Sequence, residues 1–152
     1  PIALGNRSIL GDARNPKAKY KVNGKVKFRE SFRPFAPVVL EEDASDYFAM
    51  TKPSPYMAKT YLCTKDGLPA ITHIDKSSRV QTVSKKDNAL LHQLLQDYKQ
   101  LTGCPVLLNT SFNVMGEPMV CSPSDAIETF LKSGMDSVVI GLFYITKSNG
   151  VH

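Results

Sequence analysis

The chain has 152 residues, of which 42% are hydrophobic and 22% are charged, values typical of a soluble globular domain with one buried core. No apolar stretch approaches the roughly 18 residues that a membrane span requires, and the N-terminus lacks a secretory signal pattern, so a soluble, cytoplasmic protein is predicted. The formal charge of +5 favours an anionic partner, which leaves a nucleotide, a sugar phosphate and RNA open.

The cysteines and histidines give little sign of a metal or disulfide framework. The three cysteines are odd in number and widely spaced, and the three histidines form no ligand cluster. We therefore expect reduced, mostly buried thiols and no structural metal. The first residue is proline rather than methionine, and we expect the chain to be a fragment or a processed product.

Residues 1–25 predict a loop with a short helical turn around residues 8–13. The period-two pattern of 26–35 then predicts a strand that presents Lys27, Arg29 and Arg33 on one face. Three cations on one side of a strand repel each other unless an anion lies between them, and a polyphosphate would satisfy them. The alternative is a solvated edge strand that charge protects from aggregation.

The middle of the chain predicts several strands around a short helix. The pattern predicts a buried strand at 36–40, a helix at 41–48, and strands at 59–64 and 69–74 joined by a turn. His73, Asp75 and Arg79 follow near a strand junction, just where 79–83 begins the next strand. Arg79 could complete an anion site and Asp75 could meet a metal bound to phosphates, whereas a lone histidine is more often structural.

The clearest helix is predicted over residues 87–101, ended by Gly103. Its apolar residues are interpreted as one core-facing stripe, and His92 as facing solvent. The stripe comprises Leu90, Leu91, Leu94, Leu95, Tyr98 and Leu101.

A second apolar run, 105–108, predicts a buried strand that leads directly into the polar residues Asn109, Ser111 and Asn113. Side chains just beyond a strand end are aimed well enough to hold a ligand. The alternative is an ordinary turn whose side chains bond their own backbone.

The C-terminal part predicts one helix and one strand. Ser122, Pro123 and Asp125 have the pattern of a helix start. This helix should turn Ala126, Ile127, Phe130 and Leu131 inward and end at Gly134, and 137–146 should be one long buried strand. Two helices among about six strands give an α/β (α+β) domain with a twisted mixed β-sheet flanked by helices.

Several stretches together resemble the C-terminal, YrdC-like domain of NodU/CmcH-type O-carbamoyltransferases, in register over nearly the whole of 1–152. The matching stretches are 3–10, 27–37, 73–75, 79–83, 102–113 and 116–118.

The resemblance implies a two-domain parent enzyme. The YrdC-like domain would make carbamoyl-adenylate from carbamoyl phosphate and ATP with Mg²⁺. An upstream domain of the sugar-kinase/actin-like superfold, which binds iron and is absent here, would pass the carbamoyl group to a hydroxyl of a sugar, antibiotic or nodulation-factor type.

The resemblance also implies site residues and partners. Lys27, Arg33, Arg79 and Ser111 match the family's carbamoyl phosphate and nucleotide contacts, with Arg7, Arg29, Asn109 and Asn113 as neighbours. The expected partners are the two substrates and the missing N-terminal domain, without a membrane. Alternatives are a basic RNA-binding or RNA-modification-related module and a silent domain that only docks on its partner.

Two positions depart from the family pattern. Ile2 stands where the family usually has arginine, and Lys76 replaces a usual glycine, so that the local turn is expected to differ.

Overall fold

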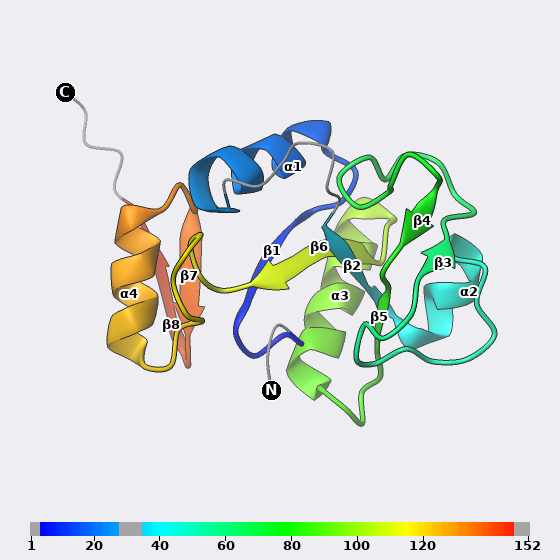
Figure 1. Ribbon diagram of the computed structural model, residues 1–152. Coiled ribbons are helices and arrows are strands. Elements are labelled where there is room, and N and C mark those ends of the chain that lie inside the picture. Colours follow the sequence, from blue (N-terminus) through cyan, green and yellow to red (C-terminus); the bar gives the residue numbers. More distant parts are fainter. Residues whose placement is uncertain (1–3, 28–34, 148–152) are drawn as a thin grey trace.

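The computed structural model describes residues 4–27 and 35–147, and its centre is a four-stranded sheet (Figure 1). The strand order is β1-β6-β2-β5. The strands are β1 (Ser8–Asp12), β2 (Ala36–Leu40), β5 (Gln81–Val83) and β6 (Val106–Ser111). Strand β6 is antiparallel to both β1 and β2, and β5 runs parallel to β2. The predicted α/β (α+β) class with a mixed sheet is confirmed.

Helix α3 (Ala89–Thr102) covers one face of this sheet (Figure 1). It begins at Asn88, whose side chain accepts a hydrogen bond from the Leu91 amide at 3.0 Å, and it ends at Gly103 with a φ of 73°. This helix was predicted within two residues at each end, because an apolar stripe and a terminating glycine are local signals. Leu91 and Leu95 pack against apolar residues of β2, β5 and β6.

The other face of the sheet is covered by the N-terminal helix and the loop-rich region after β2. Helix α1 (Pro16–Val22) is followed by a π-helical turn, η1 (Asn23–Lys27). After β2 come a 3-10 turn (Glu41–Asp43), α2 (Ala44–Tyr47) and the short pair β3 (Tyr61–Leu62) and β4 (Ser77–Ser78). Cys63 and Cys104 are free and buried here, whereas the free thiol of Cys121 is exposed.

Helix α4 (Pro123–Lys132) packs on a hairpin made of β7 (Ser137–Ile140) and β8 (Phe143–Thr146). Its predicted start is confirmed: Ser122 and Asp125 form a capping box. The expected single buried strand over 137–146 is wrong, because Gly141 turns the chain with a φ of 61° and Phe143 and Tyr144 are largely exposed.

The predicted helical turn at 8–13 is also wrong. These residues form β1, because Ser8 to Asp12 pair residue by residue with Ser111 to Leu107. A local pattern could not reveal that partner, which lies about 100 positions away in the chain. The predicted strand over 26–35 is wrong at its beginning, because Val26 and Lys27 belong to η1, and 28–34 lie outside the described residues.

Three further predictions of burial and pairing are corrected. On α3, Leu91 and Leu95 are buried while Leu90, Leu94 and Leu101 are exposed, because the sheet contacts only one side of the helix. Ile127 and Leu131 of α4 are likewise exposed. Residues 69–74 form turns, and the partner of β3 is β4.

The prediction that His92 faces solvent is wrong as well. Its side chain is buried, and its Nε2 lies 2.9 Å from a carboxylate oxygen of Glu42. Lys99, two turns later on the same helix, contacts Asp43 at 2.8 Å. These two pairs attach α3 to the segment that follows β2.

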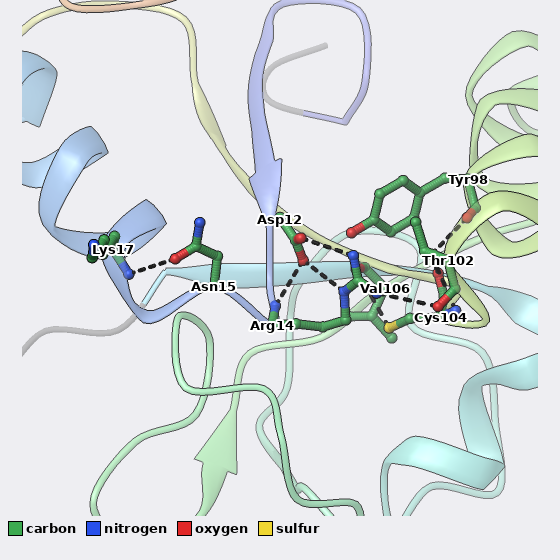
Figure 2. A network of polar contacts seen from close by, with 8 residues as sticks. All are labelled: Asp12, Arg14, Asn15, Lys17, Tyr98, Thr102, Cys104 and Val106. Carbon is green, nitrogen blue, oxygen red and sulfur yellow. Dashed lines mark hydrogen bonds and ion pairs between the residues drawn. The ribbon is translucent and has the colours of Figure 1, made fainter.

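A polar network at the end of β1 joins the sheet to the C-terminal end of α3 (Figure 2). The Arg14 guanidinium donates to both carboxylate oxygens of Asp12, at 3.0 and 2.9 Å, and to the Thr102 carbonyl at 3.1 Å. It also lies 5.6 Å from the centre of the Tyr98 ring. The bond from Arg14 holds the pKa of Asp12 at about 2, and burial raises the pKa of Tyr98 to about 12.

None of the helices in the described part of the chain is long and apolar enough to cross a membrane.

Leu95→Ala should destabilise the protein by about 3 kcal/mol, because it empties a fully buried site between α3 and the sheet. Leu94→Ala is the matched control: its side chain is 46% exposed, so the loss should stay below about 1 kcal/mol. Urea unfolding of both variants measures the difference. Equal losses would contradict the one-sided packing of α3.

Asp12→Asn should lower the free energy of unfolding at pH 7 by about 1 kcal/mol, a value reduced for the partial exposure of the pair. The folded pKa of about 2 lies below the ordinary value of 3.8, so this stability is present above pH 3.8 and is lost as the pH falls through 2. The variant and the wild type should therefore converge in acid. Asp136→Asn, which breaks the exposed contact with Lys21, should change stability little at any pH.

Candidate functional site

One end of the main sheet carries four polar side chains on the face that α3 covers: Ser8, Gln81, Asn109 and Ser111, here called the polar end. Ser8 lies opposite Ser111 in the antiparallel pair, and Asn109 lies opposite Ala36. Gln81 lies opposite Val38, which follows Ala36 by two residues in β2. Paired residues and alternate residues share a face, so all four side chains are on the same side of the sheet.

The N-terminus of α3 lies at this same end. Gly5 approaches it so closely that an added Cβ would lie 2.4 Å from a methyl carbon of Leu91. Asn88, the cap of α3, lies within 3.4 Å of Asn6, and the Ser8 hydroxyl accepts a bond from the Gly5 amide at 3.0 Å. The positive end of a helix dipole therefore points toward the polar end, which favours an anion there.

The chain after β6 forms a tight, internally bonded loop. The Ser111 hydroxyl donates to Asn113 Oδ1 at 2.7 Å, and Asn113 Nδ2 donates to the Glu117 carbonyl at 2.8 Å. Asn113 thus bonds both a backbone carbonyl and the Ser111 side chain, so its contacts are not limited to the backbone contacts that the turn interpretation expected. The Met115 amide donates to the Val26 carbonyl at 3.2 Å, which brings the backbone of η1 beside this loop.

The predicted cationic segment is anchored at both ends next to β6. Val26 contacts the loop after β6, and Ala36 pairs with Asn109. Arg29 and Arg33 lie outside the described residues, and of Lys27 the structure describes the backbone. The topology thus brings both flanks of this segment to the polar end.

Arg79 belongs to the same end of the sheet. It is exposed and precedes Gln81 by two residues, and the Gln81 side chain reaches Asn109. Strand β2 alone separates β5 from β6. Because β5 is parallel to β2 and β2 is antiparallel to β6, the chain at Arg79 enters β5 from the end of the sheet at which β6 ends.

Arg7 makes a different contact from the other predicted residues. Its guanidinium donates to the Val120 carbonyl at 3.0 Å and lies 3.6 Å from the Cys121 sulfur. It thereby joins the start of β1 to the chain that leads into α4.

His73 and Asp75 stabilise their own turn. His73 Nδ1 lies 3.2 Å from an Asp75 oxygen, and Asp75 accepts a bond from the Ser77 amide at 2.9 Å. The bonds from Ser77, more than the nearby His73, lower the pKa of Asp75. The structural interpretation of this histidine fits these contacts.

Lys76, where the resemblance leads us to expect glycine, has a φ of 63°. This is the left-handed region that glycine adopts without strain and lysine does not. The conformation is retained because the Lys76 amide donates to the His73 carbonyl at 2.9 Å and the Cys63 amide donates to the Lys76 carbonyl at 2.8 Å. Ile2, the other departure, lies outside the described residues.

A small cleft of about 180 Å³ lies elsewhere, at the opposite ends of β2 and β5. Its walls include Glu41, Met50, Lys52 and Thr82, and none of the predicted site residues. Across residues 4–27 and 35–147, no group of three or more His, Cys, Asp or Glu side chains is placed to hold a metal ion.

The sequence interpretation did not identify Gln81, Ser8 or the N-terminus of α3 as parts of the candidate site. Gln81 had a visible signal, since it is a polar residue in an otherwise apolar strand that is buried throughout. Ser8 had none, because its strand could not be recognised without its partner.

Comparison with known proteins identifies the family of the chain. The family model described as "Carbamoyltransferase C-terminus" matches residues 1–147. The chain belongs to this family of carbamoyltransferase C-terminal domains, as its motifs predicted.

Among the relatives are several nodulation proteins. The chain is 47% identical to nodulation protein NolO of Bradyrhizobium diazoefficiens, over 97% of this chain and 28% of that protein. It is 47% identical to nodulation protein U of Rhizobium tropici, over 76% of this chain and 20% of that protein. It is 43% identical to nodulation protein NolNO of Sinorhizobium fredii, over 97% of this chain and 22% of that protein. The chain thus spans less than a third of these relatives.

Lys76→Gly should raise the free energy of unfolding by about 1 kcal/mol, because it removes the strain of a left-handed lysine. Lys76→Ala removes the same charged side chain and keeps the Cβ, so it should bring no comparable gain. Thermal unfolding of the two variants and the wild type gives the comparison. A gain with alanine as large as that with glycine would assign the effect to charge rather than to backbone strain.

Proposed function

We propose that this chain forms carbamoyl-adenylate from ATP and carbamoyl phosphate for a carbamoyltransferase. The single observation that supports the proposal best is the convergence at the polar end. Asn109 and Ser111 of β6, the approach to β5 at Arg79 and both flanks of the Lys27–Arg33 region meet there. The family of the chain and the dipole of α3 point to the same class of ligand, an anion.

The proposed chemistry requires two anions to be held together. Carbamoyl phosphate is first hydrolysed to carbamate and phosphate. An oxygen of carbamate then attacks the α-phosphorus of ATP, the bond to the bridging oxygen breaks, and pyrophosphate leaves with the electron pair. Fixed cations and hydrogen-bond donors promote such a step by positioning and by stabilising charge on the phosphate oxygens.

Each predicted residue has a role in this scheme. Lys27, Arg33 and Arg79 neutralise the phosphates, Ser111 and Asn109 contact the substrates, and Arg7, Arg29 and Asn113 are the neighbouring positions that the resemblance implies. Mg²⁺ enters with ATP, because this ion commonly binds through phosphate oxygens and one or two carboxylates. Asp75 is the carboxylate nearest to Arg79 in the sequence.

We propose that a further domain completes the transfer. The relatives are about three and a half to five times longer than their matched part, which leaves room for the iron-binding, sugar-kinase-like domain that the resemblance implies. There the carbamoyl carbon would be attacked by a hydroxyl of a small molecule, and AMP would leave. A sugar, an antibiotic or a nodulation factor would be the acceptor.

Calorimetric titration with ATP and with carbamoyl phosphate tests the first half-reaction. Lys27→Ala, Arg33→Ala and Arg79→Ala should each weaken binding by about 10- to 100-fold, the effect of one charge-assisted hydrogen bond. Lys132→Ala removes a cation on α4 whose partner is Glu128, and it should leave both affinities unchanged. In the complete enzyme, losing one cation should raise the barrier by about 3 kcal/mol. Unchanged affinity in all three variants would reject these assignments.

The net charge of +5 also supports a second candidate, an RNA-binding module. Against this candidate, the chain lacks the sequence signature of the aromatic platforms on which single-stranded RNA stacks. A gel-shift titration at rising salt separates the two functions. Tight, steeply salt-dependent RNA binding that does not respond to ATP would favour the RNA module.

A further inference from the structure

Two amide side chains, Gln81 of β5 and Asn109 of β6, are hydrogen-bonded to each other inside the polar end. Asn109 Nδ2 donates to Gln81 Oε1 at 2.6 Å. The two residues are 2% and 1% exposed, so water cannot replace either partner. A buried amide that loses its partner incurs the full desolvation penalty, which makes this bond a strong constraint on both side chains.

The bond spans the intervening strand β2. Two strand spacings separate β5 from β6, or roughly 9.5 Å, and only long side chains that lean toward each other cover this distance. Ala36, the residue of β2 opposite Asn109, has a single methyl group and leaves room for the contact. The pair therefore lies over β2 on the face of α3.

The bond selects one of two orientations of the Asn109 amide. Because the NH₂ group points to Gln81, the carbonyl oxygen Oδ1 points away from β5. The two sides of an asparagine differ chemically, since one donates and the other accepts. A flipped Asn109 would exchange the accepting oxygen for the donating NH₂ group on the side away from β5, and it would no longer accept a hydrogen bond from a donor group of a ligand there.

We infer that Gln81 is a positioning residue: it holds the NH₂ group of Asn109, so that the Asn109 carbonyl oxygen is directed away from β5, where it accepts a hydrogen bond from a donor group of the substrate at the polar end, such as the carbamoyl NH₂. This inference rests on the proposed function of the site. Gln81 acts through Asn109, and it also connects Arg79, two residues earlier in the chain, with β6. No role in binding was assigned to Gln81 by the sequence motifs.

A double-mutant cycle tests this coupling, with ATP and carbamoyl phosphate as the titrated ligands. Gln81→Leu removes the acceptor and should weaken binding about tenfold. Asn109→Leu should weaken it at least as much. The double variant should bind no more weakly than Asn109→Leu alone, because the effect of Gln81 passes through that amide.

Thr82→Val is the matched control for loss of fold. Thr82 is the next residue of β5, is 1% exposed, and accepts a hydrogen bond from the Ser54 amide at 2.9 Å. It should lower the unfolding temperature about as much as Gln81→Leu and leave both affinities within twofold. If Gln81→Leu does not fold, Gln81→Met keeps the unbranched shape and still lacks the acceptor.

The outcomes separate this inference from the proposed function. Wild-type chain that binds neither substrate would overturn both. Wild-type binding with additive effects of Gln81→Leu and Asn109→Leu, or with an affinity unchanged by Gln81→Leu and Gln81→Met, would overturn the positioning role alone. A loss of affinity in Thr82→Val equal to that in Gln81→Leu would assign the effect to stability and would also overturn it.

Discussion

The structure depends on the pairing of β6 along both of its edges. This strand is buried from Val106 to Thr110, so each of its amide and carbonyl groups needs a partner within the protein. β1 and β2 supply those partners, one on each side. Because both are antiparallel to β6, the C-terminal end of β6 meets the beginning of β1 and of β2. The polar residues of β6 are thus enclosed by two strand starts rather than open to solvent.

The same pairing explains how distant segments of the chain reach the same end of the sheet. Ala36, at the start of β2, lies beside Asn109, and the chain at Arg79 enters the parallel strand β5 from the same end. Helix α3 adds its N-terminus through Asn88 and the close approach of Gly5. A site built from several rigid elements can hold two anions at fixed separation, which is the main requirement of adenylate formation.

Sequence reasoning succeeded where a feature has a local physical cause. The glycine at 103 and the capping box at Ser122 act within one helical turn, and the structure contains both. It failed where the secondary structure or the burial of a residue depends on partners that are distant in the sequence. Strand β1 exists through its pairing with β6, and Leu90 is exposed while Leu91 is buried because the sheet contacts only one side of α3.

The features of the candidate site can likewise be divided into those that the sequence determines locally and those that depend on distant partners. The sequence alone determined the α/β class, the family and the residue types of an anion site, since motifs, composition and charge are properties of the chain itself. The tertiary structure alone decided that Asn109 is bonded to Gln81 across β2, that Arg7 contacts Val120, and that Asn88 at the start of α3 lies beside Asn6. Those contacts join residues 28 and 113 positions apart, as well as Asn6 and Asn88, which lie 82 positions apart. Such partners are selected by the packing of the whole sheet, because no local pattern encodes which strand lies beside which.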